Sequence, residues 1–299
     1  MISKLEMQAY EGFIARAASF NSPFALKGSF LTRQFCANPA NRLPADLDWY
    51  CTQTFGDMED AEKIFNIWLM TVCHSDLKDG VRFKRLDSDN IYWENSDYAM
   101  YNHFATVNTE INAFIGDEKI SLNIEISFNW PVPFEPVSME YRADNGKTFT
   151  LAKVPPLAVQ LGWKMHQCII EPRMKDFVDL YLLLENVNID AHTENLVDET
   201  TKYLLAELKA SDTENNRVGN FFSHHFSNLF YDLDAEDFWE FWRNDMLDEL
   251  KNDYWEYTTF SNLYQIENFP YQLSDFWALL ANTLATVGFT REKIDVVLE

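Results

Sequence analysis

The hydrophobic periodicity of this chain changes at Pro155-Pro156. Before these prolines, short strand-like apolar runs alternate with helical patterns, whereas beyond them apolar residues recur almost only at helical spacing. A chain of 299 residues is long enough for two modest domains, each with its own hydrophobic core. The pattern therefore predicts an α+β chain, with a strand-and-helix domain over residues 1–153 and a helical domain over residues 154–299.

The strand signal is clearest over residues 119–128. Side chains are apolar at the even positions from Ile120 to Phe128 and polar at the odd positions between them, which predicts a strand with one buried face. Gly116-Asp117 suits a hairpin turn that would pair this strand with residues 103–114. We expect further strands at residues 24–26, 46–51, 136–141 and 148–151. We expect helices at residues 4–18, 30–35, 59–73, 157–168, 174–184, 194–208, 220–230, 236–251, 274–287 and 291–298.

The chain is strongly acidic, with 47 Asp and Glu against 24 Lys and Arg and a formal net charge of −23. Broad, sequence-independent binding to nucleic acid needs many cationic side chains on phosphates, so we expect no extended nucleic-acid-binding surface and only a local basic site. Apolar runs are far shorter than the roughly 20 residues that cross a bilayer, so we expect no membrane association. The N-terminal residues lack the unbroken apolar stretch of a secretion signal, and we expect a cytoplasmic protein.

Two further sets of residues are interpreted as structural. The four cysteines are widely spaced without a C-x-x-C pair, so we expect reduced core thiols rather than a zinc knuckle or a disulfide framework. The aromatic residues from Phe238 to Trp242 lie among acids that would repel phosphates. We therefore interpret them as a helix core or a protein interface rather than as a platform for stacking bases.

The constellation that bears on function is Gly28-Ser29, then Asp46-x-Asp48, then Glu125. Gly28-Ser29 predicts a turn with exposed backbone amides and a hydroxyl group. Strand alternation sends Asp46 and Asp48 to the same face, and Glu125 could join them across the sheet. Three converging carboxylates repel one another unless a cation compensates, and hard oxygen ligands suit Mg²⁺ or Mn²⁺. We therefore expect these acids to converge on a divalent cation that faces the Gly28 turn.

An acid-x-acid pair is common by chance in so acidic a chain, and a solvated strand end is its structural alternative. What distinguishes this pair is its context, because it directly follows a strand, a Gly-Ser turn, a helix and a loop that would place it beside a phosphate cradle. Sixteen residues, 30–45, separate Ser29 from Asp46, which indicates an extended helix or loop.

The order of these motifs resembles a known family. Residues 24–33 together with residues 42–48 resemble the opening motif of the AbiEii/AbiGii family of nucleotidyltransferase-like toxins, within the DNA polymerase β-type nucleotidyltransferase superfamily. Residues 122–127 fall where this family carries its third acid. Residues 154–164 and 173–180 are similar to its helix lysine and its Arg-x-Lys-Asp motif.

The resemblance implies a polymerase β-like nucleotidyltransferase domain with a small mixed sheet, followed by a helical domain that closes the cleft. It implies transfer of a nucleoside monophosphate from an NTP to a hydroxyl group of a tRNA end or a protein, with Mg²⁺ or Mn²⁺ as cofactor. It also implies the toxin of a type IV-like toxin–antitoxin or abortive-infection system, with an antitoxin protein as partner. The implied metal ligands are Asp46, Asp48 and Glu125. The implied catalytic residues are Asp46, Asp48, Glu125, Lys164 and Asp176. The implied nucleotide-binding residues are Gly28, Ser29, Lys164, Arg173, Lys175 and Asp179.

Three alternatives remain open at this point. The chain could be an interaction protein on a catalytically altered nucleotidyltransferase scaffold that binds a basic partner through its acidic helical part. It could be a metal-dependent phosphohydrolase, which would need histidines near the acids. Finally, Lys164 could be a solvated lysine, and the charged residues of 173–179 could form a surface ion-pair set worth little stability.

Overall fold

The computed structural model describes residues 2–44, 46–95, 105–190, 192–211, 215–230, 235–244 and 260–293. These residues pack into two compact units. The sheet unit consists of the described residues within 2–34 and 44–155, and the helical unit consists of those within 35–43 and 156–299. Packing thus assigns residues 35–43 to the helical unit, which the sequence did not indicate. The predicted domain division after residue 153 stays a prediction.

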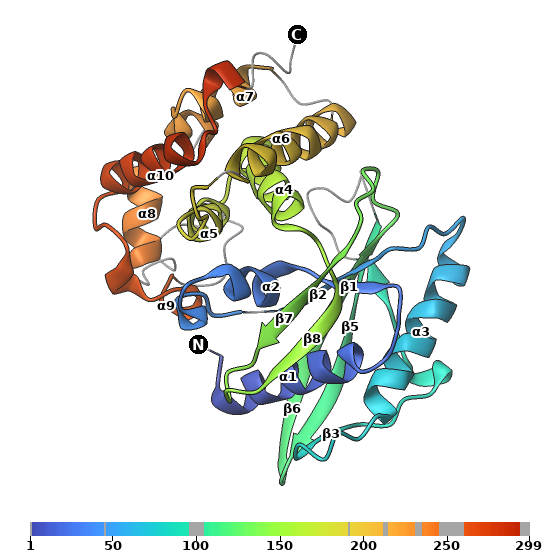
Figure 1. Cartoon of the computed structure of the whole chain (residues 1–299). Helices are drawn as coiled ribbons and strands as arrows, with labels where there is room; N and C mark the ends of the chain where they lie inside the picture. Colours follow the sequence, from blue (N-terminus) through green and yellow to red (C-terminus); the bar gives the residue numbers. More distant parts are fainter. Residues whose placement is uncertain are drawn as a thin grey trace. The chain divides into compact units, whose positions relative to one another are not determined.

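The strands of the sheet unit are β1 (Phe24–Leu26), β2 (Leu47–Cys51), β3 (Val81–Phe83), β4 (Glu94–Asn95), β5 (Ala105–Ile115), β6 (Glu118–Phe128), β7 (Val137–Arg142) and β8 (Thr148–Val154). Six of them form a mixed sheet in the order β1-β2-β6-β5-β3, with β4 paired to β5 (Figure 1). Pairing is parallel between β2 and β6 and antiparallel between the other neighbours. Strands β7 and β8 form a second, two-stranded sheet. The predicted α+β class with a small mixed sheet is confirmed.

Two helices, α1 (Lys4–Ala18) and α3 (Met58–His74), pack on the apolar face of the large sheet (Figure 1). Phe13 of α1 and Trp68 of α3 both contact Trp49 of β2, with ring centroids 6.2 and 5.1 Å from that indole. All three side chains are buried. Because burial of a large apolar side chain contributes about 1.5–3 kcal/mol, this contact determines which face of β2 points into the core.

The opposite face of the sheet carries polar side chains. Strand side chains alternate, so Asp48, the neighbour of Trp49, points away from the helices. In β6 the predicted alternation is confirmed, because the even-numbered side chains from Ile120 to Phe128 are buried. Asp48 lies directly opposite Glu125 in the parallel ladder of β2 and β6. The register therefore places two predicted site residues side by side on the polar face.

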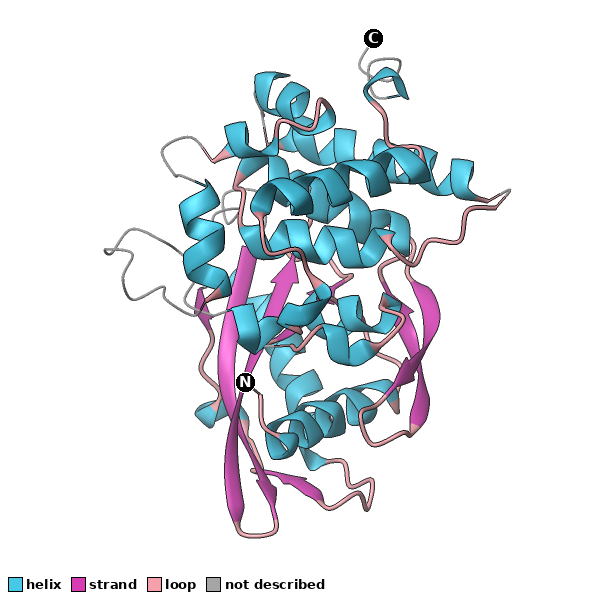
Figure 2. Cartoon of the chain, turned by 90° about the vertical axis from the view of Figure 1, so that its left-hand side faces the viewer, coloured by secondary structure: helices cyan, strands magenta, loops and turns pink. Residues whose placement is uncertain are grey.

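The helical unit is built from helices and loops (Figure 2). Its helices are α4 (Leu157–Ile170), α5 (Met174–Leu184), α6 (Thr193–Ala210), α7 (Asn215–Phe222), α8 (Ala235–Arg243), α9 (Phe260–Leu263) and α10 (Leu273–Val287). Its core is aromatic: Trp239 stacks on Phe276, and Trp242 packs edge-on against Phe260. Both tryptophans are fully buried, so the interpretation of residues 238–242 as helix core is confirmed.

The prediction of one helix over residues 220–230 is wrong. Helix α7 ends at Phe222, and His224 adopts a left-handed backbone conformation with φ of +60°, after which a short 3₁₀ turn begins at Phe226. An α-helix cannot continue through a left-handed residue. Parts of three other predicted elements, residues 103–104, 245–251 and 294–298, lie outside the described residues.

All four cysteines are free and buried, as predicted from their spacing. In the described part of the chain, none of the helices combines the length and the apolar character needed to cross a bilayer.

Candidate active site

Gly28 begins α2 (Gly28–Phe35), one residue after the lysine that follows β1. Its φ of +68° lies in the left-handed region, which favours glycine. A Cβ atom at this position would lie 2.8 Å from the Cβ of Asp48 and would overlap its carboxylate. Both the backbone conformation and the close approach of Asp48 therefore require glycine here.

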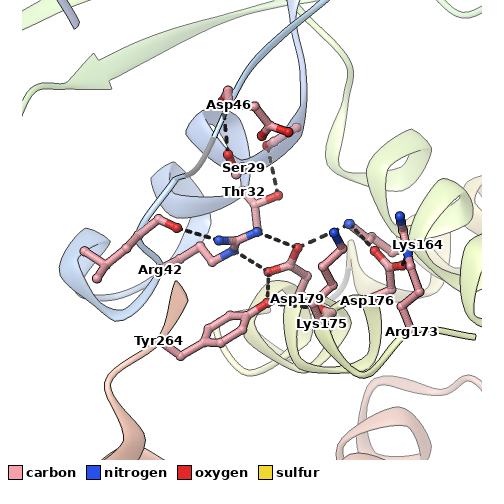
Figure 3. A network of polar contacts seen from close by, with 12 residues as sticks. Ser29, Thr32, Arg42, Asp46, Lys164, Arg173, Lys175, Asp176, Asp179 and Tyr264 are labelled. Carbon is pink, nitrogen blue, oxygen red and sulfur yellow. Dashed lines mark hydrogen bonds and ion pairs between the residues drawn. The ribbon is translucent and has the colours of Figure 1, made fainter. Parts of the chain in front are cut away.

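Ser29 and the rest of the first turn of α2 lie beside this contact between Gly28 and Asp48. The Ser29 hydroxyl donates to the backbone carbonyl of Asp46 at 3.4 Å, and the Thr32 hydroxyl donates to the carbonyl of Gly28 at 3.1 Å (Figure 3). Backbone N–H groups in the first turn of a helix lack intrahelical partners and attract anions. The start of α2 thus lies next to Asp48, and its role as a phosphate cradle stays a prediction.

Asp48 and Glu125 form an acidic pair on neighbouring strands, and Lys27 reaches both of them. The Lys27 Nζ lies 3.7 Å from the Asp48 Oδ1 and 3.4 Å from the Glu125 Oε1. The side chain of Lys27 is 15% exposed, that of Asp48 is 13% exposed and that of Glu125 is 21% exposed. Lys27 is not among the predicted site residues, although it directly precedes Gly28 in the motif.

Of the three acids that were predicted to converge, the structure brings Asp48 and Glu125 together. Asp46 lies just before β2, and its backbone carbonyl accepts the Ser29 hydroxyl. Among the residues that the structure describes, no three His, Cys, Asp or Glu side chains lie close enough together to hold a metal ion. The kind of donor nevertheless suits Mg²⁺, which proteins usually hold by one or two carboxylates with substrate phosphates completing the shell. The metal ion and its ligands stay predictions.

A second polar group lies in the helical unit, around Asp176 of α5. The Lys164 Nζ, from α4, lies 2.7 Å from the Asp176 Oδ1, and the Arg173 Nε donates to the Asp176 Oδ2 at 2.6 Å (Figure 3). Asp176 is fully buried, while Lys164 is 18% exposed. The residues of 173–179 are therefore not a surface ion-pair set, and Lys164 is not a solvated lysine.

Asp179, one helical turn after Asp176, joins the same group. Its Oδ2 lies 3.2 Å from the Lys164 Nζ, and Arg42 binds both of its oxygens, with Nε at 2.6 Å and Nη2 at 3.3 Å. The Tyr264 hydroxyl lies 2.9 Å from the Asp179 Oδ1 and 3.0 Å from the carbonyl of Lys175. The spacing of three residues on a helix correctly places the two aspartates on one face.

Arg42 and Tyr264 were not predicted as members of this group. They come from segments far apart in the sequence, which are joined by a backbone hydrogen bond from Leu43 to Leu263 at 2.8 Å. The Arg42 guanidinium also stacks over the Tyr264 ring, 5.0 Å from its centroid. Arg42 stands in the motif that carries the family resemblance, but no local pattern marks Tyr264.

The charges of this cluster keep its members ionised. Burial alone would raise the pKa of Asp176, but Arg173 and Lys164 hold it well below its usual range. The pKa of Asp179 is likewise lowered, because Arg42 and Lys164 outweigh the effect of burial. For Lys164, burial alone would lower the pKa, but Asp176 and Asp179 raise it above its usual value. The cluster thus holds Lys164 as an ammonium ion.

The predicted residues therefore fall into two groups. One group, in the sheet unit, contains Gly28, Ser29, Asp46, Asp48 and Glu125. The other, in the helical unit, contains Lys164, Arg173, Asp176 and Asp179, with Lys175 contributing its carbonyl. In the second group three cationic side chains surround two carboxylates, which is a local excess of positive charge in a chain of net charge −23.

Residues 13–282 match the model of a family described as the nucleotidyl transferase AbiEii toxin of a type IV toxin–antitoxin system. No sequence among the curated proteins matches this chain. Two crystal structures from Helicobacter pylori resemble its fold: JHP933, at 13% identity and a TM-score of 0.45, and a candidate nucleotidyltransferase, at 15% and 0.43. The first match covers 100% of this chain and 98% of the other, and the second covers 99% of each. Neither likeness is close enough to bear on function.

Proposed function

Because the chain belongs to the AbiEii family of nucleotidyltransferase toxins of type IV toxin–antitoxin systems, we propose that it transfers a nucleoside monophosphate from an NTP to the hydroxyl group of an RNA end or a protein. The family match confirms the resemblance inferred from the ordered motifs. The family is one of transferase enzymes, which favours this interpretation over the binding-only alternative.

The observation that carries the proposal is the position of Asp48. It lies in register with Glu125 and so close to Gly28 that no side chain fits between them. Carboxylates beside the first turn of a helix combine a cation-binding and an anion-binding surface in one place, which is what a nucleoside triphosphate with its counter-ion requires.

In this proposal Asp48 and Glu125 would hold the divalent cation, with Asp46 two residues before Asp48. When bound, such a cation neutralises charge on the phosphates and on the leaving pyrophosphate. The chain's own contribution is positional: the backbone amides at Gly28 and Ser29 would orient the triphosphate. Glu125 would accept the proton of the attacking hydroxyl.

From the helical unit we propose Lys164 as a phosphate ligand. It stays protonated because of its two aspartates, and its partial exposure leaves it accessible. Arg173 shares the same carboxylate and would add a second cation. A phosphate anion is attracted to such a local excess of positive charge even on an acidic protein.

The test is transfer of radiolabel from each of the four α-labelled NTPs to cell extract. We expect one or more labelled products with the wild-type protein and a loss of about 100-fold or more in Asp48→Asn, because an in-line transfer depends on the bound cation. Asp117→Asn, in the exposed turn between β5 and β6, is the matched control and should keep its activity. Sensitivity of the product to ribonuclease or to protease identifies the acceptor. Equal transfer by wild type and Asp48→Asn would refute the proposal.

We also propose that this chain is the toxin of its pair and that an antitoxin counteracts it, in line with its family. Induced expression in a bacterial host should then arrest growth with the wild-type protein and with Asp117→Asn, but not with Asp48→Asn. Arrest by all three proteins at equal expression would separate toxicity from transfer.

A further inference from the structure

Lys27 occupies a position determined by the sheet. It follows β1 directly, and its backbone N–H donates to the carbonyl of Asp48 at 2.9 Å, which extends the ladder of β1 and β2 by one residue. Residues opposite each other in a ladder point to the same face. Since Asp48 in turn lies opposite Glu125, three adjacent chain segments place one ammonium and two carboxylates in a row.

The two carboxylates alone would be an unfavourable pair. Neighbouring strands lie roughly 4.8 Å apart, so two ionised acids in register repel one another, and at 13% and 21% exposure water screens that repulsion only in part. The Lys27 ammonium lies within 3.7 Å of both. It therefore supplies, from the chain itself, the positive charge that the pair needs.

We infer that Lys27 is a built-in counter-ion of the pair Asp48 and Glu125, and that its ammonium competes with a divalent cation for these two carboxylates. The inference rests on the proposed function only in taking a divalent cation as the ligand of the pair. A metal ion that binds between Asp48 and Glu125 must displace the ammonium or lie against a like charge. Metal binding without nucleotide is therefore weak, and the phosphates of an NTP offset the charge of Lys27 when metal and nucleotide bind together.

The experiment measures binding of Mn²⁺ alone, without nucleotide, to the full-length protein by electron paramagnetic resonance of the free ion. Lys27→Met keeps the length of the side chain and removes its charge, so it should bind Mn²⁺ about tenfold or more tightly than wild type. Lys27→Arg keeps the charge and should bind like wild type. Lys63→Met, which removes an exposed lysine of α3, is the matched control and should not change the affinity.

Two further variants show where the ion binds. Asp48→Asn should weaken Mn²⁺ binding. In the double variant Asp48→Asn with Lys27→Met, the higher Mn²⁺ affinity expected for Lys27→Met alone should disappear. As a second readout, millimolar Mn²⁺ should raise the melting temperature of Lys27→Met more than that of wild type, because a ligand that binds the folded state stabilises it.

Equal or weaker Mn²⁺ affinity in Lys27→Met than in wild type overturns the inference, and so does the absence of detectable binding in both. A gain that survives in the double variant overturns it as well, since the ion would then bind elsewhere. The proposed function fails separately, by normal nucleotide transfer in Asp48→Asn. Loss of transfer in Asp48→Asn without a gain of Mn²⁺ affinity in Lys27→Met refutes only the role of Lys27.

Discussion

The two groups of candidate site residues are built differently. Around Asp176 and Asp179, contacts of 2.6–3.3 Å join buried carboxylates to Arg42, Lys164 and Arg173. Around Asp48 and Glu125, one ammonium serves two carboxylates at 3.4 and 3.7 Å, and all three side chains are partly exposed. The helical unit thus holds a closed cluster, whereas the sheet unit holds an open pair.

The difference indicates a division of roles. In a closed cluster each charge has a short, direct partner, so the cluster holds Lys164 in place. Removing one partner is costly because it leaves a buried charge unpaired. In the open pair the contacts to the ammonium are longer and the carboxylates are partly exposed, which suits the approach of a cation. We therefore expect substitutions in the closed cluster to affect folding first and substitutions in the open pair to affect chemistry first.

The largest effect on stability should come from Asp179→Ala. This change leaves the Arg42 guanidinium buried without its carboxylate, and breaking a buried pair costs about 3–5 kcal/mol of unfolding free energy. Asp48→Asn, in the open pair, should cost about 1 kcal/mol or less. Urea unfolding of both variants measures the difference. Similar losses in the two variants would mean that the distinction between a closed and an open group is wrong.

Gly28→Ala should cause the next largest loss of unfolding free energy, because the added methyl group would overlap with Asp48 of the open pair. A left-handed φ and overlap with Asp48 should together cost about 2–3 kcal/mol. Gly116→Ala is the matched control: its φ is +59°, but nothing lies within 4 Å of the new Cβ, so about 1 kcal/mol is expected. The measurement is urea unfolding, and equal losses would show that Asp48 moves aside without cost.

The pH dependence of stability should have opposite signs for Glu11 of the sheet unit and Asp176 of the helical unit. In the sheet unit, burial raises the pKa of Glu11 to about 7, against partial compensation by the Asp144 backbone N–H and Arg33. The unfolded state then releases this proton first, so the unfolding free energy should fall by on the order of 2–3 kcal/mol as pH rises from about 4.5 to about 7. In the helical unit, the lowered pKa of Asp176 contributes stability that is present above pH 3.8 and lost in stronger acid.

Glu11→Gln tests whether Glu11 causes the predicted decline of stability in the sheet unit. It should remove the decline of stability between about pH 4.5 and 7, whereas Glu118→Gln, at the exposed start of β6, should leave the decline unchanged. The measurement is the unfolding free energy from urea titrations at several pH values. A decline that persists in Glu11→Gln would assign it to another group.

Within the closed cluster, a smaller effect than that of Asp179→Ala should come from Tyr264→Phe, which removes one hydroxyl group. Its hydrogen bond to the buried Asp179 is 2.9 Å long, and its loss should cost about 1–2 kcal/mol. Tyr141→Phe is the matched change in the sheet unit, where the hydroxyl lies 3.5 Å from the Glu11 Oε1. A smaller loss is expected there, and a larger one would reverse the predicted order.

Local patterns predicted most of the elements but not their partners. The helix over residues 4–18 and the strands over residues 24–26 and 119–128 were predicted to within a residue or two, because the apolar periodicity is strong there. The single helix over residues 220–230 was wrong, because a left-handed His224 interrupts it without a glycine or proline to signal the break. The two groups of predicted site residues follow the change of pattern near residue 155, but no local pattern indicates that Arg42 and Tyr264 join the second group.

By itself, the sequence determined the succession of strands and helices, the buried face of β6 and the family, since each depends on periodicity or on motifs a few residues long. Only the tertiary structure decided that Lys27, Asp48 and Glu125 share one row, and that Arg42 meets Tyr264 and Asp179. Those positions depend on strand register and on packing between segments up to 222 residues apart. Such contacts form because a buried charge without a partner costs free energy. The partner is determined by the tertiary packing, and no local sequence pattern indicates it.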